Sequence, residues 1–403
     1  MRRAPELAAV AEVGGSPRKR GGRTAGLVLG GLAALAGSTV GTALGSAAYF
    51  ARRVVTPDER LPDDVMILSH DAQSVTFATG KDPVVPGRYG VWLDGGAGHA
   101  RIGEILAQDK VSVTRQLVAV DRGRLQVGPA RWNQYYWWDR PRASMDLADE
   151  DAPVLSDVGV LPGWVVRPEP GTDNGAWAVL VHGRGARKEE TLRAVPVLRR
   201  AGYTSLVAAY RNDRDAPKGP DGRYNLGLSE WRDVEAAMAY AVARGAREIV
   251  LFGWSMGGAI VLQVLDNSPL AQRVSGVVLD SAVLDWGAVL RHQARMNRMP
   301  GWLAHVATRL MGDVRARRLV GVHEPIDVAR ADWVRRAAEL RHPMLVIHSD
   351  DDDFVPVGPA VAVAARRPDL VRFERWTQAR HCREWNNDPE RWERAVAEFL
   401  ATR

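Results

Sequence analysis

The sequence feature best suited to chemistry is a serine between glycines, Gly-Trp-Ser-Met-Gly at 253–257. An apolar, β-branched run (248–252) precedes it, and an apolar run with helical character (259–265) follows it. A strand, a tight turn and a helix in this order hold a serine hydroxyl clear of its own backbone, where it can attack a carbonyl carbon. Side chains at Gly253 or Gly257 would collide across such a turn. The pattern therefore predicts that Ser255 is a nucleophile.

A serine nucleophile needs a histidine as its base and a carboxylate that orients this histidine. On a strand-turn-helix of this kind the acid and then the base follow the serine in the chain. His381 is the single histidine beyond the acidic run 350–353. It lies in a loop between a strand pattern (370–376) and a terminal helix pattern (389–400). His381 is therefore the expected base.

The acid is expected after the buried-strand pattern 344–347, and here the sequence resembles the α/β-hydrolase superfamily. A late strand of that superfamily commonly ends in His-Gly-x-x-Asp-x-x-Val-Pro, and residues 348–356 read His-Ser-Asp-Asp-Asp-Asp-Phe-Val-Pro. The resemblance implies that Asp352 is the acid, although Ser349 stands at the family's glycine. Because four aspartates follow one another, the alternatives Asp350, Asp351, Asp353 and, more distantly, Asp280 remain open.

The resemblance extends to His-Gly-Arg-Gly at 182–185, which follows the strand pattern 177–181. It is similar to the His-Gly-x-Gly turn of the family, with Gly183 as its first glycine. It implies that the backbone N–H groups of Arg184 and Met256 bind the oxyanion of the transition state. Each such donor contributes about 3 kcal/mol to transition-state stabilisation. His182 itself is expected to be structural.

The elements that must position these residues alternate between strand and helix patterns from residue 164 onward. This alternation predicts an α/β fold with a doubly wound, mostly parallel sheet. We expect an α/β-hydrolase domain over 166–403, with a helical lid at about 283–341. The resemblance is closest to the branch of monoglyceride lipases, lysophospholipases and serine-aminopeptidase-like enzymes.

A separate region, 54–165, precedes the hydrolase domain. Its short, alternating strand-like runs, separated by turn residues, predict a small β-rich accessory module. The densest aromatic cluster of the chain, 131–138, lies in this region. We expect the cluster to pack against the hydrolase domain.

Charge is concentrated at the N-terminus of this 403-residue chain. The net charge is +6, and residues 1–53, with eight basic and two acidic side chains, account for all of it. The remainder is balanced, which argues against nucleic acid binding. Residues 24–51 carry no charged side chain and exceed the roughly 20 residues that span a bilayer. We expect a cytoplasmic tail (1–23), a transmembrane anchor (24–51) and an extracytoplasmic catalytic domain. Secretion after signal cleavage is the alternative.

These features together predict a membrane-anchored serine hydrolase that cleaves a small-molecule ester, with a lipid-like or apolar acyl group, through an acyl-enzyme on Ser255. A serine at this position argues against the dehalogenase and epoxide hydrolase chemistries of the family, which need a carboxylate. A peptidase or amidase, an acyltransferase or thioesterase with the same residues, and a non-catalytic binding module are the alternatives. The single cysteine, Cys382, excludes an internal disulfide and a cysteine-based zinc site. No cofactor or metal is expected.

Overall fold

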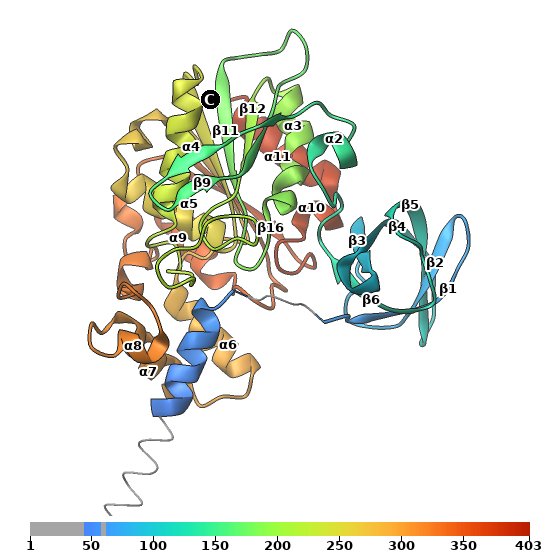
Figure 1. The fold of residues 1–403 in the computed structure, drawn as a ribbon, viewed down its shortest axis with the longest axis horizontal. Coiled ribbons are helices and arrows are strands. Elements are labelled where there is room, and N and C mark those ends of the chain that lie inside the picture. The colour runs from blue at the N-terminus through green and yellow to red at the C-terminus, as the bar shows by residue number, and fades with distance from the viewer. Residues whose placement is uncertain (1–43, 58–61) are drawn as a thin grey trace, which may run out of the picture. The chain divides into compact units, whose positions relative to one another are not determined.

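Six antiparallel strands close into a small barrel in the computed structural model, which describes residues 44–57 and 62–403 (Figure 1). The strand order is β1-β2-β5-β4-β3-β6, and a short 3-10 turn, η1 (Asp94–Gly96), follows β3. Side chains of alternating strand positions, such as Val75 and Phe77, fill its interior. The predicted β-rich module is thus confirmed as a barrel. Its strands are β1 (Val65–His70), β2 (Ser74–Ala78), β3 (Tyr89–Leu93), β4 (Gly98–Gln108), β5 (Ser112–Arg122) and β6 (Gly128–Asn133).

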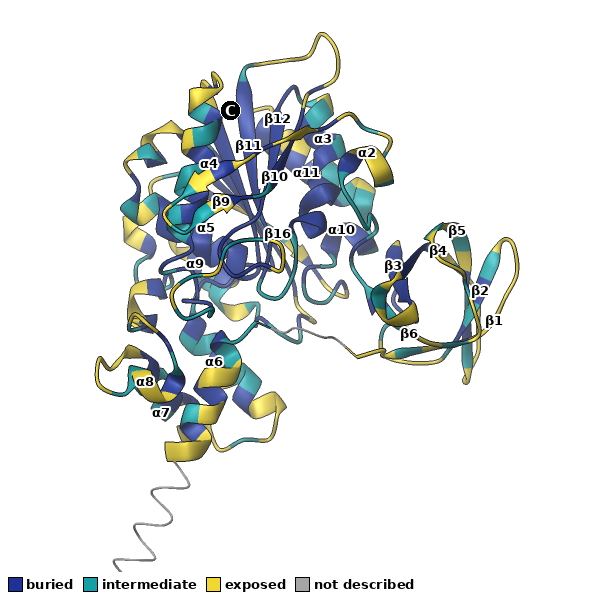
Figure 2. Cartoon of the chain, viewed as in Figure 1, coloured by how far each residue is buried: buried dark blue, intermediate teal, exposed yellow. Residues whose placement is uncertain are grey.

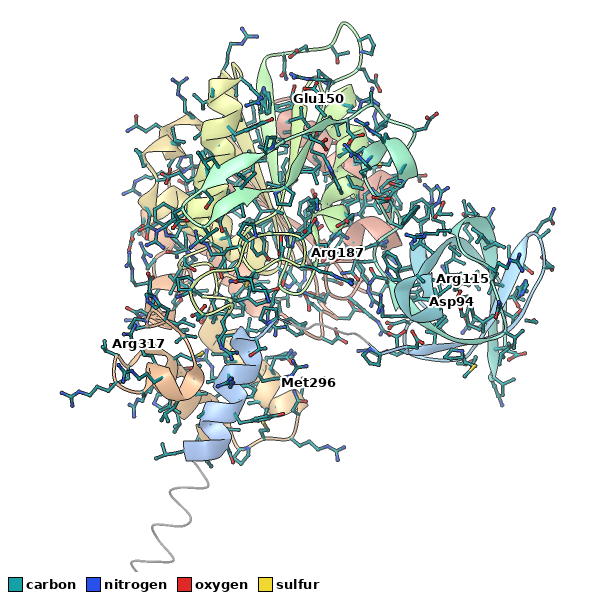
Figure 3. The ribbon with its side chains drawn as sticks, in the orientation of Figure 1. Asp94, Arg115, Glu150, Arg187, Met296 and Arg317 are labelled. Atoms are coloured by element: carbon teal, nitrogen blue, oxygen red, sulfur yellow. The ribbon has the colours of Figure 1, made fainter. Side chains whose placement is uncertain are left out.

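A buried arginine, Arg115 of β5, lies within the barrel (Figure 3). Its guanidinium donates hydrogen bonds to backbone carbonyls of Gly103 and of the loop that joins β2 to β3. The rings of Tyr89 and Trp132 lie 5.7 and 5.5 Å from it. Burial lowers the pKa of Arg115 to about 10. Because a buried charge is tolerated only when it is hydrogen-bonded, this arginine fixes the loop conformation.

The second sheet has eight strands in the order β16-β15-β14-β13-β11-β12-β10-β7. Strands β11 to β16 are parallel, whereas β10 and β7 add an antiparallel edge. The sheet therefore takes strands from before residue 166, the predicted start of the domain. A separate two-stranded sheet joins β8 (Val154–Ser156) to β9 (Gly159–Leu161). The strands are β7 (Glu150–Asp151), β10 (Gly163–Val166), β11 (Ala176–Val181), β12 (Thr204–Ala208), β13 (Glu248–Trp254), β14 (Val274–Asp280), β15 (Met344–Ser349) and β16 (Val371–Trp376).

Helices cover both faces of this sheet, so its central strands are buried on both sides (Figure 2). Helices α3 and α11 pack on one face, and α4, α5 and α9 on the other. This arrangement confirms the α/β-hydrolase fold predicted from the sequence. The helices are α2 (Pro141–Ser144), η2 (Lys188–Ala194), α3 (Val195–Arg200), α4 (Trp231–Ala243), α5 (Met256–Asn267), η3 (Pro269–Arg273), α9 (Gly358–Arg366), α10 (Glu384–Asn387) and α11 (Pro389–Leu400).

The segment between β14 and β15, where the lid was predicted, consists of short helices. The side chains of Leu303, Ala307 and Met311 on one face of α7 are buried in the core, whereas Trp302 is half exposed. The helical pieces are α6 (Trp286–Met296), α7 (Gly301–Gly312), α8 (Arg317–Val320), η4 (Val328–Ala331) and η5 (Ala337–Glu339).

Residues 44–55 are helical, and Phe50, Ala51 and Val55 are buried in the same core as the lid helices. The predicted anchor 24–51 lies mostly outside the described residues, but its predicted end at residue 51 is wrong, because Ala47, Phe50 and Ala51 are buried in this core. Over 44–57 and 62–403, none of the helices combines the length and apolar character needed to cross a bilayer.

Candidate active site

Ser255 occupies a strained turn between β13 and α5. Its backbone angles, φ 51° and ψ −118°, lie in a region that side-chain-bearing residues rarely adopt. A Cβ at Gly253 would lie 2.6 Å from Gly258 Cα, so this glycine is needed across the turn, as predicted. A Cβ at Gly257 would instead lie 2.1 Å from the carbonyl oxygen of Val181. Gly257 therefore lets α5 begin against the end of β11, which differs from the predicted clash within the turn.

The three predicted catalytic side chains meet at the carboxyl ends of the parallel strands. His381 Nε2 lies 3.0 Å from Ser255 Oγ, and His381 Nδ1 lies 2.8 Å from Asp352 Oδ2. Ser255 follows β13, Asp352 follows β15 and His381 follows β16. Parallel strands end at one edge of the sheet, which explains why residues 126 positions apart form one hydrogen-bonded chain. This geometry allows proton transfer from the serine to the histidine.

The other aspartates that remained candidates for the acid form hydrogen bonds or ion pairs with residues other than His381. Ser349, at the position of the family's glycine, donates to Asp351 and accepts from the N–H of Ala379. This serine therefore ties the acid loop to the histidine loop. The partners of the remaining carboxylates are Arg375 for Asp350, the Arg380 N–H for Asp351, Lys81 for Asp353 and the Trp392 indole for Asp280.

The electrostatics of the site lower the pKa of the acid and raise the pKa of the histidine. Burial alone would raise the pKa of Asp352, but the charge of His381 and a hydrogen bond from His348 outweigh it, so this pKa is lowered. The N–H groups of Phe354 and Val355 also donate to Asp352, each at 2.8 Å. Burial would lower the pKa of His381, yet the Asp352 carboxylate raises it above its ordinary value. Asp352 thus stabilises the imidazolium that forms during catalysis.

His348 is a second histidine at the acid that the sequence analysis gave no role. It lies near the end of β15, and its Nε2 lies 3.1 Å from Asp352 Oδ2 and 3.0 Å from the carbonyl oxygen of Val355. An N–H shared between these acceptors fixes the orientation of the carboxylate. The signal was present in the sequence, since His348 opens the motif that identified Asp352.

The turn at 182–185 lies against the nucleophile. A Cβ at Gly183 would lie 3.0 Å from Ser255 Cβ. Met256 is the first residue of α5, where backbone N–H groups have no acceptor within the helix. The predicted oxyanion donors, Arg184 and Met256, thus come from the two elements that flank Ser255. Their role in binding an oxyanion stays a prediction.

Contacts of His182 and of Glu190 hold this turn in place. His182 is buried, lies 2.8 Å from Asp213 and stacks on Tyr210, which agrees with a structural role. Glu190 Oε2 accepts a hydrogen bond from the N–H of Gly183 at 3.1 Å. The sequence contained no motif that marked Glu190.

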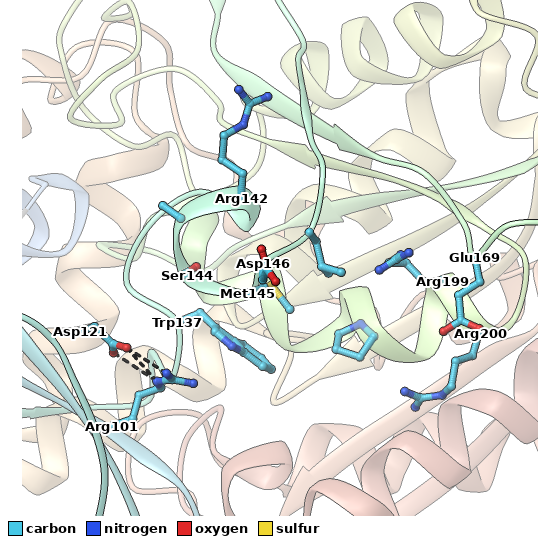
Figure 4. Close-up of a pocket in the computed structure, with 13 residues that line it drawn as sticks. Arg101, Asp121, Trp137, Arg142, Ser144, Met145, Asp146, Glu169, Arg199 and Arg200 are labelled. Carbon is cyan, nitrogen blue, oxygen red and sulfur yellow. Dashed lines mark hydrogen bonds and ion pairs between the residues drawn. The ribbon is translucent and has the colours of Figure 1, made fainter.

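A cavity of about 590 Å³ lies away from the catalytic side chains and is lined by residues such as Trp137 and Arg199 (Figure 4). Other arginines at its wall already have acidic partners, for example Arg101 with Asp121. Among the described residues, no cluster of histidine, cysteine, aspartate or glutamate could hold a metal ion.

Two family models match the sequence. The model described as the alpha/beta hydrolase family matches residues 178–400, and one described as a domain of unknown function, DUF8805, matches residues 66–133. The second match coincides with the barrel. A search of curated proteins gave no match.

Solved esterase structures share the fold of the hydrolase domain. The Pyrococcus furiosus esterase Pf2001 is 18% identical with a TM-score of 0.50, and the alignment covers 66% of this chain and 93% of that one. The esterase RhEst1 from Rhodococcus sp. ECU1013 is 20% identical with a TM-score of 0.44, over 64% of this chain and 99% of that one. At 18% identity the likeness to Pf2001 shows the fold alone.

Proposed function

Because the chain belongs to the alpha/beta hydrolase family, we propose that it is a serine carboxylesterase that forms an acyl-enzyme on Ser255. The observation that carries this proposal is the hydrogen-bonded chain from Ser255 through His381 to Asp352. A serine, a histidine and a buried carboxylate in this order are the groups that acyl transfer needs.

The reaction proceeds in two steps. Ser255 Oγ attacks the ester carbonyl carbon while His381 Nε2 accepts its proton. Asp352 stabilises the resulting imidazolium through Nδ1. The oxyanion is bound by the N–H groups of Arg184 and Met256, and His381 then donates the proton to the leaving alcohol. Water, deprotonated by His381, attacks the acyl carbon; the bond to Ser255 Oγ breaks, and His381 returns the proton to Oγ as the acid leaves.

The proposed substrate is a small carboxylic ester with an apolar acyl group. The Pyrococcus furiosus protein with the same fold is named as an esterase, which is consistent with this class. Within the family, we propose the branch of monoglyceride lipases, lysophospholipases and serine-aminopeptidase-like enzymes, and its support is the helical segment α6–α8 between β14 and β15. The esterase name of the Pyrococcus furiosus protein favours an ester over an amide as the scissile bond.

The proposal includes a membrane anchor within 24–46, because Ala47, Phe50 and Ala51 are buried in the hydrolase core, with residues 1–23 in the cytoplasm and the catalytic domain outside. Its support is the sequence alone: a stretch of 28 residues without a charged side chain follows six basic residues. Alkaline extraction of membranes tests the anchor, since an integral protein stays in the pellet. Release of the full chain into the supernatant would refute it.

Turnover of p-nitrophenyl esters of increasing chain length tests the esterase activity. We expect Ser255→Ala to abolish turnover and Ser275→Ala, a serine of β14 in the same domain, to retain it. Turnover of the matching p-nitroanilides in place of the esters would show an amidase. Ester turnover by Ser255→Ala equal to that of Ser275→Ala would refute the mechanism.

A further inference from the structure

The loop between β2 and β3 of the barrel, residues 79–88, contacts both catalytic loops. Asp82 Oδ1 accepts hydrogen bonds from Arg380 at 3.1 Å and from Arg383 at 2.6 Å. Lys81 forms an ion pair with Asp353. The arginines flank His381, and Asp353 follows Asp352. Two consecutive barrel residues therefore hold the neighbours of both the base and the acid.

The Asp82 contacts are shielded from solvent. The side chains of Asp82, Arg380 and Arg383 are 17%, 18% and 17% exposed. Ion pairs that are partly withdrawn from water hold their geometry better than surface pairs, which solvent screens. Burial alone would lower the pKa of Arg383, but Asp82 outweighs it and raises this pKa. Asp82 therefore joins both arginines of the histidine loop at a place where little water competes for them.

The backbone of the same loop also docks on α10, directly after the histidine loop. The N–H of Arg88 donates to the carbonyl oxygen of Asn386 at 2.8 Å, and the Asn386 side chain donates back to the carbonyl of Arg88 at 2.6 Å. A Cβ at Gly87, where φ is +116°, would lie 2.0 Å from the Asn386 carbonyl oxygen. Only glycine permits this approach.

The barrel holds this loop rigidly through Arg115. Its guanidinium donates to the carbonyls of Pro83 at 2.8 Å, Val85 at 2.8 Å and Gly87 at 2.6 Å. These three carbonyls belong to the segment that carries Asp82. The barrel interior therefore helps to set the position of Asp82, together with a hydrogen bond within the loop from the N–H of Val85 to the Asp82 carbonyl oxygen at 3.1 Å.

The histidine loop needs such support, because its backbone is strained on both sides of His381. Arg380 and Cys382 have φ values of 64° and 53°, in the left-handed region that side-chain-bearing residues disfavour. Strained residues persist only where their surroundings hold them. Inside the hydrolase domain, Asp351 accepts from the N–H of Arg380, Ser281 accepts from the N–H of Cys382, and Arg193 donates to the Cys382 carbonyl. Asp82 adds the contact that comes from the barrel.

From these contacts we propose that the barrel is a positioning domain of the active site, in which Asp82 and the β2–β3 loop hold His381 in line with Ser255 and Asp352. The inference rests on the proposed serine mechanism and gives the domain of unknown function a role. Asp82 is a positioning residue, since it acts on His381 through Arg380 and Arg383.

The test compares Asp82→Asn and Gly87→Ala with the wild-type full chain. The assay temperature lies below the lowest thermal unfolding midpoint of these proteins, so that all of them are folded. Asp71→Asn is the matched control, because Asp71 caps the β1–β2 turn and its hydrogen bonds to described residues lie within that turn. We expect both loop variants to lose about 10- to 100-fold in kcat on a p-nitrophenyl ester, with KM within about twofold of wild type. Asp82→Glu, which keeps the carboxylate, should recover part of the loss.

A second readout does not depend on the substrate. The proton between His381 Nδ1 and Asp352 gives a downfield NMR signal, which should weaken in Asp82→Asn and persist in Asp71→Asn. If the NMR signal depends on Asp82 in this way but the wild type turns over no ester, the proposed function fails and the positioning role stands. Retention of both the signal and the wild-type kcat in Asp82→Asn and Gly87→Ala would overturn the inference.

Discussion

Replacing Asp352 by asparagine removes the acid of the proposed mechanism with almost no change in volume. The wild-type carboxylate accepts from His381 Nδ1 at 2.8 Å, from His348 Nε2 at 3.1 Å and from two backbone N–H groups. Asparagine presents an amide N–H2 to one side of this site. If that group faces His381, the imidazole must carry its proton on Nε2, where it cannot accept the proton of Ser255.

The expected loss in kcat follows from two contributions of Asp352 to His381 that asparagine does not make. In a Ser-His-Asp triad, the wrong histidine tautomer and the loss of the charge that stabilises the imidazolium together lower kcat by about 10⁴-fold. A tenfold change corresponds to about 1.4 kcal/mol, so the expected rise in the barrier is about 5 kcal/mol. KM should change little, because Asp352 contacts no substrate atom in the proposed mechanism.

The pH dependence of kcat/KM is an independent test, because the direction in which it shifts is predicted. In the wild type Asp352 raises the pKa of His381, and the base works only when deprotonated, so kcat/KM falls as the pH drops through that raised pKa. In Asp352→Asn the raising charge is gone, while burial still lowers the pKa of His381. The acidic limb of the residual activity should therefore move to lower pH.

The assay is the pH profile of kcat/KM for a p-nitrophenyl ester, with Asp350→Asn as control. Asp350 pairs with Arg375 and does not contact His381, so its variant should keep the wild-type profile. A loss in kcat of less than tenfold in Asp352→Asn, or an acidic limb that stays in place, would refute the assignment of the acid.

Three further changes test other parts of the site. His348→Leu removes a buried donor to Asp352, and we expect about a tenfold loss in kcat, because a hydrogen bond to a charged group contributes about 1.5–3 kcal/mol; kcat equal to wild type would contradict this. Gly257→Ala places a methyl group against Val181 and should lower the free energy of unfolding by at least about 1–3 kcal/mol in a urea titration. Arg184→Met keeps the backbone N–H but removes hydrogen bonds to the carbonyls of Arg53, Val54 and Thr56, so amide exchange of residues 47–56 should accelerate while kcat stays within about threefold.

The sequence sufficed for the parts of the site that depend on local structure. Ser255 was predictable because a strand, a turn and a helix lie within about 20 consecutive residues. His381 followed from chain order. Within the four aspartates the motif favoured Asp352 but left its neighbours open, because a loop has no periodicity that distinguishes neighbouring residues. The contact of 2.8 Å between His381 and Asp352 distinguishes them in the structure.

The parts that depend on long-range pairing could not be predicted. Closure of the barrel requires β1 to pair with β6, and strand-like runs do not specify such a pairing. β10 joins the hydrolase sheet by pairing antiparallel with β12, although its four-residue run resembles the other strands. Asp82 meets Arg380 across 298 positions of sequence, and no motif marks either residue.

The most direct test of the central claim is to label the full chain with a fluorophosphonate and locate the adduct by peptide mass spectrometry. The mechanism predicts a single adduct on Ser255 that His381→Ala and Asp352→Asn slow strongly and Ser275→Ala does not affect. An adduct on another serine, or equal labelling of Ser255 in wild type and His381→Ala, would contradict the account.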